Sequence, residues 1–166
     1  MRRGAGVVLL ALALLAALGA WPAAGAEDEE LVAVSLEGGR RPLAPGRSRE
    51  LTICLRVAPG FHINGPASAA DPGLVPTRLR LEAERGLSFG PLRWPRPQEV
   101  KLSSLGRPAA VYHGRILVRT TVRVAPEAVP GPRRVRLDLS YQACNDRVCQ
   151  MPRRRRLVFT LRVAAP

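Results

Sequence analysis

Apolar and polar residues alternate along several stretches of this chain, and this period of two is the feature that most restricts its fold. Between Glu50 and Val57 every second residue is apolar, whereas the residues between them are Thr52, Cys54 and Arg56. Such alternation predicts a strand with one face in a core. The same pattern recurs in four further sets, and residues Leu31 to Leu36 add a candidate first strand; the sets are Leu79 and Leu81, then Ile116, Val118, Thr120, Val122 and Val124, then Val135, Leu137, Leu139 and Tyr141, and finally Leu157, Phe159, Leu161 and Val163.

Turn-forming residues separate these stretches. The 166 residues include 16 prolines and 15 glycines, and no capped helical pattern survives among them. Many short strands with regular turn signals predict an all-β fold, an immunoglobulin-like β-sandwich with its core between two sheets. Because aromatic residues are only 4% of the chain, this core must consist mainly of Val, Leu, Ile and Ala.

The first 26 residues have the layout of a secretory signal peptide. Two arginines precede an apolar run from Val7 to Leu18, and the small residues Ala24-Gly25-Ala26 follow. The run is shorter than the roughly 20 residues that a membrane-spanning helix needs. We therefore expect cleavage before Glu27, a periplasmic or otherwise exported protein, and one domain over residues 27–166 without a membrane span.

The chain is strongly basic, and arginine carries nearly all of its positive charge. Its 26 Lys and Arg residues give a net charge of +13 against 13 Asp and Glu residues, and Lys101 is the only lysine. In an exported protein this charge favours an anionic envelope surface or an acidic partner protein over nucleic acid. Most arginines alternate with apolar residues, as on a solvated sheet face. The run Arg153 to Arg156 does not, and it either guards a sheet edge, the interpretation that we favour, or forms a docking patch.

Two of the three cysteines, Cys144 and Cys149, have four residues between them and join one predicted strand to the next. A bent loop of this length can close into a disulfide. Closing a loop of about six residues stabilises a fold by only about 2 kcal/mol, against about 4 kcal/mol or more for long loops. Nearby positive charge favours the thiolate that exchange requires, and Arg147 lies inside the loop, although Asp146 opposes it. The spacing alone leaves a reactive and a structural disulfide equally open.

The third cysteine and the two histidines give weaker signals. Cys54 falls on the strand face opposite the apolar residues, where a buried, inert thiol is the usual outcome and an exposed one would invite intermolecular pairing. A zinc or copper site would need His62 and His113 beside the cysteine pair, because structural zinc usually takes four ligands. Each histidine is more typical of an ordinary loop or strand residue. We therefore expect no metal and no other cofactor.

Four sequence segments together identify a protein family more specifically than any one of them alone. They are Pro59-Gly60-Phe61-His62-Ile63-Asn64, Val75-Pro76-Thr77, Val111-Tyr112-His113-Gly114, and Tyr141-Gln142-Ala143-Cys144 with Asp146, Cys149 and Pro152. The combination resembles the amino-terminal periplasmic domain of the thiol:disulfide interchange protein DsbD. The resemblance spans about Leu31 to Val163, and the closing segment is its most specific part.

This resemblance implies an immunoglobulin-like domain that relays electrons by thiol-disulfide exchange. The donor would be a thioredoxin-like protein and the acceptors would be disulfide-containing periplasmic proteins, so the chain would serve as a component of a protein-disulfide reductase. By the likeness, Cys144 and Cys149 are the redox pair, and Cys149 forms the mixed disulfide with a partner. The resemblance makes a reactive pair the favoured hypothesis.

Relatives shield their cysteines with a cap loop, in some cases with an aromatic tip. The corresponding segment, about residues 98–110, has no aromatic residue, so Leu102 and Leu105 would have to form the lid. Glu99 is a candidate for proton transfer to a departing thiolate. The matching segments add four supporting candidates, which are Tyr141, Asp146, Phe61 and His62.

Full-length relatives continue into a membrane-embedded conduit and a thioredoxin-like domain, whereas this chain ends at Pro166. We therefore expect its reductant to come from another polypeptide, and we expect a monomer that binds no nucleic acid. Two other functions stay open. One is a binding module in which the disulfide is only structural, and the other is an exported copper-binding or zinc-binding protein.

Overall fold

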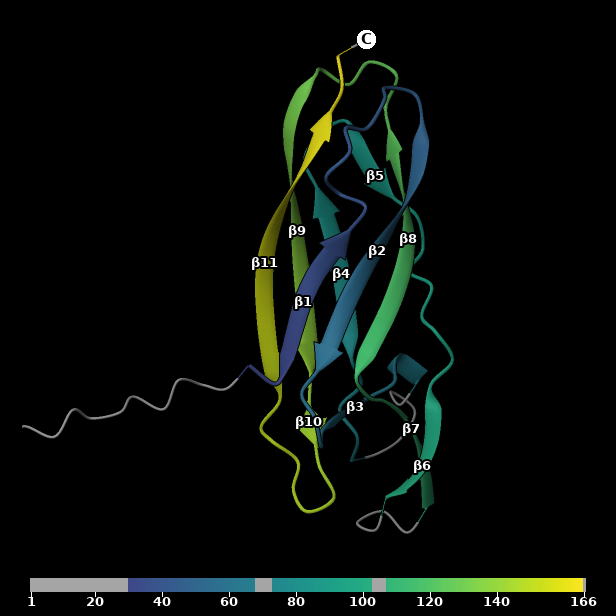
Figure 1. Ribbon diagram of the computed structural model, residues 1–166, viewed down its shortest axis with the longest axis vertical. Coiled ribbons are helices and arrows are strands. Elements are labelled where there is room, and N and C mark those ends of the chain that lie inside the picture. Colours follow the sequence, from purple (N-terminus) through teal and green to yellow (C-terminus); the bar gives the residue numbers. More distant parts are fainter. Residues whose placement is uncertain (1–29, 68–72, 103–106, 166) are drawn as a thin grey trace, which may run out of the picture.

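A computed structural model describes residues 30–67, 73–102 and 107–165, and nearly all of their regular structure is strand (Figure 1). The signal peptide expected at residues 1–26 lies outside the described residues. The strands are β1 (Val32–Glu37), β2 (Ser48–Val57), β3 (His62–Asn64), β4 (Arg78–Ala83), β5 (Leu87–Phe89), β6 (Gln98–Leu102), β7 (Arg107–Tyr112), β8 (Arg115–Val124), β9 (Gly131–Tyr141), β10 (Ala143–Cys144) and β11 (Arg153–Val163). Among the described residues, no helix has the length and apolar character to span a membrane.

The strands form three antiparallel sheets. One sheet has the order β1-β2-β8-β5, a second has the order β11-β9-β4, and the third has the order β10-β3-β7-β6. The first two sheets run along the long axis of the molecule as two layers (Figure 1). The predicted all-β, immunoglobulin-like sandwich is therefore confirmed.

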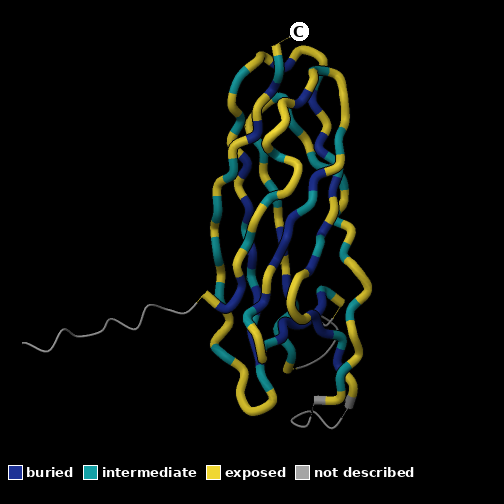
Figure 2. The backbone as a smooth tube through the Cα atoms, in the orientation of Figure 1, coloured by how far each residue is buried: buried dark blue, intermediate teal, exposed yellow. Residues whose placement is uncertain are grey.

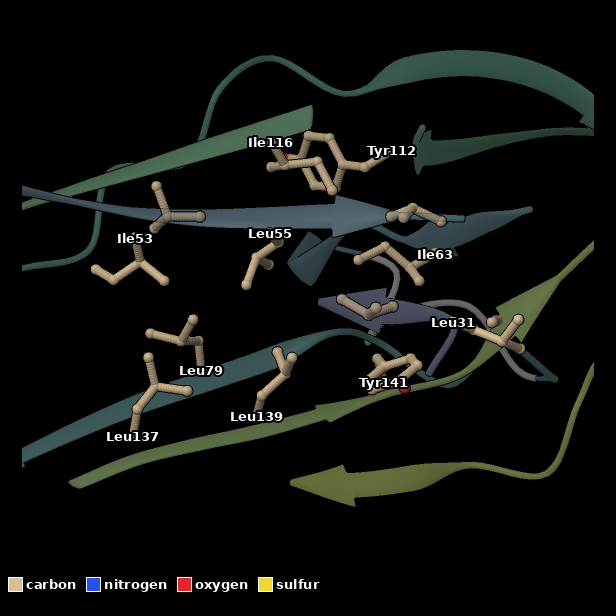
Figure 3. Close-up of a cluster of buried hydrophobic side chains, with 14 residues drawn as sticks. Leu31, Ile53, Leu55, Ile63, Leu79, Tyr112, Ile116, Leu137, Leu139 and Tyr141 are labelled. Carbon is tan, nitrogen blue, oxygen red and sulfur yellow. The ribbon is translucent and has the colours of Figure 1, made fainter. Parts of the chain in front are cut away.

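The core lies between these two layers and is built from the alternating residues that the sequence singled out. Ile53 and Leu55 of β2 face Leu137 and Leu139 of β9 across the interior (Figure 3), and all four are fully buried. Thr120 of β8 is also buried, and its hydroxyl donates a 2.9 Å hydrogen bond to the carbonyl of Gly90. Burying a hydroxyl that has a hydrogen-bond partner costs little free energy, so a threonine can occupy this core-facing position of β8.

The arginine run lies at an open edge of the sandwich. β11 is the outermost strand of its sheet, as the edge interpretation of Arg153 to Arg156 requires. Arg155 forms an ion pair with Glu30, and its Nη1 donates a 2.9 Å hydrogen bond to the carbonyl oxygen of Val32. This side chain therefore ties β11 to the edge of the opposite sheet and occupies an acceptor that another strand could use.

The third sheet lies at one end of the sandwich, opposite the end at which the described chain terminates (Figure 1). Its strands β3, β6, β7 and β10 were not predicted, because two to six residues are too few for a clear period of two. The segment 98–110, expected as a cap loop, is largely a hairpin in which Gln98 pairs with Val111 and Lys101 with Pro108. The side chain of Leu102 and all of Leu105 lie outside what the structure describes, so their role as a lid remains a prediction.

Candidate functional site

Cys144 and Cys149 form a disulfide at the end of the sandwich that carries the third sheet. Their sulfur atoms are 2.05 Å apart and their Cα atoms are 4.0 Å apart. The two residues are paired across a short antiparallel hairpin. Backbone hydrogen bonds close this hairpin on both sides of the disulfide, from Asn145 N to Val148 O at 3.0 Å and from Gln150 N to Ala143 O at 2.8 Å.

The tip of the hairpin is shaped by an asparagine. The side-chain oxygen of Asn145 accepts hydrogen bonds from the backbone N–H groups of Arg147, at 2.9 Å, and Val148, at 2.8 Å. Asparagine makes such turns readily because its short side chain reaches the backbone two residues further on. Gln142 adds a 3.0 Å hydrogen bond from its amide nitrogen to the carbonyl of Gln150. The loop therefore has a frame of hydrogen bonds that does not include the sulfur atoms.

The two cysteines differ in exposure. Cys144 is 2% exposed, whereas Cys149 is an exposed residue. Figure 2 shows this change from buried to exposed along the loop between β10 and β11. Close to Cys149, the apolar side chains of Val148 and Met151 are 52% and 80% exposed. Cys149 is therefore the more accessible of the two cysteines.

His62 is the strand neighbour of Cys144 on the side away from Cys149. β10 pairs with β3 so that Cys144 lies opposite His62 and Ala143 lies opposite Ile63. Directly opposed residues of an antiparallel pair project to the same face. Since Ala143 and Ile63 belong to the main core cluster, His62 and Cys144 share the other face of this small sheet.

The environment of His62 is buried and polar. The residue is 3% exposed, and its Nε2 has no hydrogen-bond partner among the described residues. Its ring centroid is 5.5 Å from that of His113, which follows β7. Burial is the main cause that lowers the pKa of His62, the neighbouring His113 lowers it further, and the carboxylate of Asp146 opposes both. His62 therefore stays neutral at neutral pH.

The other predicted site residues are not paired with the cysteines. Asp146 is exposed in the loop and close enough to act electrostatically on His62. Phe61 is half-buried and packs against the main core. Tyr141 is fully buried in that core, and burial raises its pKa. Glu99 is exposed on β6, and the strands β3 and β7 lie between β6 and β10, so strand pairing does not bring it to the cysteines.

Two further residues that hold the site together were not predicted as site residues, although both belong to the quoted sequence segments. Asn64 is fully buried, and its amide nitrogen donates a 3.0 Å hydrogen bond to the carbonyl of Val75. Tyr112 stacks on Trp94 with ring centroids 5.7 Å apart, and its hydroxyl donates a 2.6 Å hydrogen bond to the carbonyl of Pro95. These contacts fix β3 and β7, and hence the row of strands beside Cys144.

The third cysteine lies elsewhere. Cys54 is 3% exposed on β2, which fits the expected buried thiol, and Arg115 Nε lies 3.4 Å from its sulfur. The described part of the chain contains no group of three or more His, Cys, Asp or Glu residues arranged to hold a metal ion. His62 and His113 are together, but no such ligand set is formed around them.

The family model described as the N-terminal part of the thiol:disulfide interchange protein DsbD matches residues 36–161. No curated protein matches the chain. Among solved structures, the N-terminal domain of Neisseria meningitidis DsbD in the reduced form is 17% identical over 82% of this chain and 93% of that chain, with a TM-score of 0.45.

Two further structures are similar. A complex between the DsbD N-terminal and PilB N-terminal domains of Neisseria meningitidis gives 18% identity over 79% of this chain and 84% of that chain, with a TM-score of 0.46. The seventh ScaB type I cohesin from Pseudobacteroides cellulosolvens gives 15% identity over 81% and 93%, with a TM-score of 0.50, which reflects the fold alone. The family model, in contrast, spans well over half of the chain. The chain therefore belongs to the family of N-terminal domains of the thiol:disulfide interchange protein DsbD.

Proposed function

We propose that this domain is a carrier in thiol-disulfide exchange. It takes two electrons from a thioredoxin-like donor and passes them to disulfide-containing periplasmic proteins through Cys144 and Cys149. The observation that carries the proposal is a short-loop disulfide with one exposed and one buried cysteine, set in a hairpin whose hydrogen bonds do not depend on it. Membership of a thiol:disulfide interchange family supports the class of reaction.

The exposure of Cys149 supports the following order of steps. A donor thiolate attacks the sulfur of Cys149, the bond to Cys144 breaks, and Cys144 leaves with the electron pair. The second thiolate of the donor then attacks the donor sulfur in the mixed disulfide and releases reduced Cys149. On the acceptor side, Cys149 attacks the acceptor disulfide, and Cys144 then displaces the acceptor and restores the internal disulfide.

The surface around Cys149 fits a protein partner better than a small molecule. Four large apolar residues are strongly exposed among those described, and two of them, Val148 and Met151, flank Cys149. Methionine adapts its shape to different surfaces. We infer that these two side chains form the contact through which successive partners reach the sulfur. The exposed Arg147 next to them favours a partner with acidic groups at its rim.

A purely structural disulfide is the main alternative. It predicts a reduction potential below about −300 mV, whereas a pair that exchanges with partners has a higher potential. Equilibration of the purified domain in a series of dithiothreitol or glutathione buffers measures this value. A very low potential, together with no reduction by a thioredoxin-like protein, would overturn the proposed function.

A trapping experiment assigns the two sulfurs. The Cys144→Ser variant lacks the resolving thiol, so Cys149 should remain linked to its partner, and the complex should survive non-reducing electrophoresis. The Cys149→Ser variant is the matched control and should trap nothing, because the buried Cys144 is inaccessible to a protein. Equal trapping by both variants would contradict the assigned order.

We also propose that the domain works outside the cytoplasm after cleavage before Glu27. The composition of the first 26 residues supports this location, and an oxidising compartment is where such a disulfide is chemically useful. Mass spectrometry of the protein from fractionated cells tests it. The expected result is a mature chain that begins at Glu27 in the periplasmic fraction.

A further inference from the structure

The thiol that must resolve the mixed disulfide is the buried one, and this creates a problem for the exchange reaction. Cys144 can attack only as a thiolate, and burial disfavours a charged sulfur. Water has little access to a residue that is 2% exposed. A proton acceptor inside the protein would remove this obstacle.

The strand pairing places one such acceptor beside Cys144. Cys144 pairs with Cys149 on one side and with His62 on the other, so the three side chains form a row across neighbouring strands. Directly opposed residues have their Cβ atoms about 5 Å apart. His113 extends this row, with its ring 5.5 Å from that of His62.

His62 has an unused nitrogen in this position. Its Nε2 is buried and has no hydrogen-bond partner in the structure, and a buried polar atom without a partner is unusual enough to require an explanation. A neutral imidazole has one nitrogen that accepts a proton. An unpartnered ring nitrogen on the strand residue opposite a thiol that must ionise is a candidate proton acceptor for that thiol.

We propose that His62 accepts the thiol proton of Cys144 when Cys144 resolves the mixed disulfide. This inference rests on the proposed exchange function. In the resolving step, the proton moves from Cys144 to His62, the Cys144 sulfur bonds to that of Cys149, and the partner sulfur leaves as a thiolate. The partner disulfide is thereby reduced to two thiols and the domain is oxidised by two electrons.

The groups that surround His62 are compatible with this role. His113 approaches from the end of β7 and Asp146 acts from the cysteine loop, and within the described parts of the chain these are the charged or titratable neighbours that affect His62. Because burial and His113 lower its pKa while Asp146 opposes them, His62 is unprotonated and able to accept a proton at neutral pH. Glu99 is not part of this row, because it lies on the far strand of the sheet.

A small disulfide probe separates the two steps. Reduced domain is mixed with dithiobis(nitrobenzoic acid), which releases one coloured thiolate when Cys149 attacks and a second when Cys144 resolves the mixed disulfide. All proteins carry Cys54→Ala, so that the third thiol does not contribute. Stopped-flow absorbance then gives the two rates from about pH 5 to pH 9, the range in which histidine and cysteine titrate.

His62→Gln tests the inference, with His113→Gln as the control one place further along the row. We expect His62→Gln to leave the first rate within about twofold and to slow the second by about 100-fold at neutral pH, as for loss of a general base. The second rate of this variant should rise steadily with pH, whereas that of the parent levels off above the pKa of His62. His113→Gln should keep both phases of thiolate release and shift only the pH midpoint of the second phase.

The outcomes are distinct. An unchanged second rate and pH profile in His62→Gln would overturn the role of His62 and leave the proposed function intact, whereas absence of the second release in the parent protein would refute both. If circular dichroism shows that His62→Gln does not fold, the inference is tested on the parent protein instead. The midpoint of its second phase must then match the titration of the His62 ring followed by nuclear magnetic resonance, and a mismatch would overturn the inference.

Discussion

Reduction of the Cys144–Cys149 disulfide is expected to weaken the fold only slightly. The bond closes a loop of six residues, counting both cysteines. The chain-entropy relation then gives a contribution of about 2.2 kcal/mol at 25 °C. The hydrogen bonds on both sides of the disulfide, and those made by Asn145, remain available in the reduced protein. A carrier needs this property, because it must stay folded in both states.

Urea unfolding of the oxidised and reduced domain measures the difference. We expect the free energy of unfolding to fall by about 2 kcal/mol with an unchanged dependence on urea, and the melting temperature to fall by roughly 5–10 °C. The Cys144→Ser/Cys149→Ser double variant is the control and should give the same value with and without reductant. A loss of more than about 4 kcal/mol, or a reduced state without a cooperative transition, would refute the reasoning and favour a structural disulfide.

Three further predictions concern the docking surface, the core and pH. Replacing both Val148 and Met151 by Ser should slow reduction of the disulfide by a thioredoxin-like protein about fivefold, the equivalent of about 1 kcal/mol of lost contact. The rate of reduction by dithiothreitol should stay unchanged. Equal effects on the two rates would argue against a docking role. Leu137→Ala should lower the free energy of unfolding by about 2–5 kcal/mol in urea titrations, because Leu137 is fully buried, whereas Val158→Ala at an exposed position should change it by less than about 0.5 kcal/mol. Burial lowers the pKa of His62 below its usual 6.5, so as the pH falls this histidine is protonated in the unfolded chain before it is protonated in the folded protein. The free energy of unfolding should therefore be retained above pH 6.5 and decrease below it. The decrease should be less steep in His62→Gln.

The long strands could be predicted because each of them has one face in the interior between the two main sheets. At Ile53, Leu137 and Ile116 the period of two persists for at least four positions, and burial of these residues is what the pattern encodes. The short strands of the third sheet do not show this pattern. β3 has three consecutive buried residues, His62 to Asn64, so no alternation marks it. Only pairing with β7 and β10, which are distant in the sequence, makes it a strand.

The sequence predicted the disulfide pair of the candidate site but not its geometry. The spacing of Cys144 and Cys149 indicated a disulfide, and the family likeness favoured exchange, but the difference in exposure depends on which cysteine is held in the sheet. Cys144 lies in β10, whereas Cys149 is beyond the turn. Likewise, His62 and Cys144 are separated by 81 intervening positions in the sequence, and only the register of β3 with β10 places them opposite one another.

If the domain is the carrier that we propose, this arrangement meets two requirements that otherwise conflict. A sulfur that meets partners must be exposed, and a sulfur that waits for the second step should be shielded from stray oxidants. Placing Cys149 beyond the turn and Cys144 in the sheet meets both requirements with one hairpin. The shielded sulfur then loses access to water as a proton acceptor, and in our proposal the buried His62 on the adjacent strand takes over this role. Because His62 is proposed to act only on the shielded sulfur, His62→Gln should slow the second step and leave the burial of Cys144 unchanged.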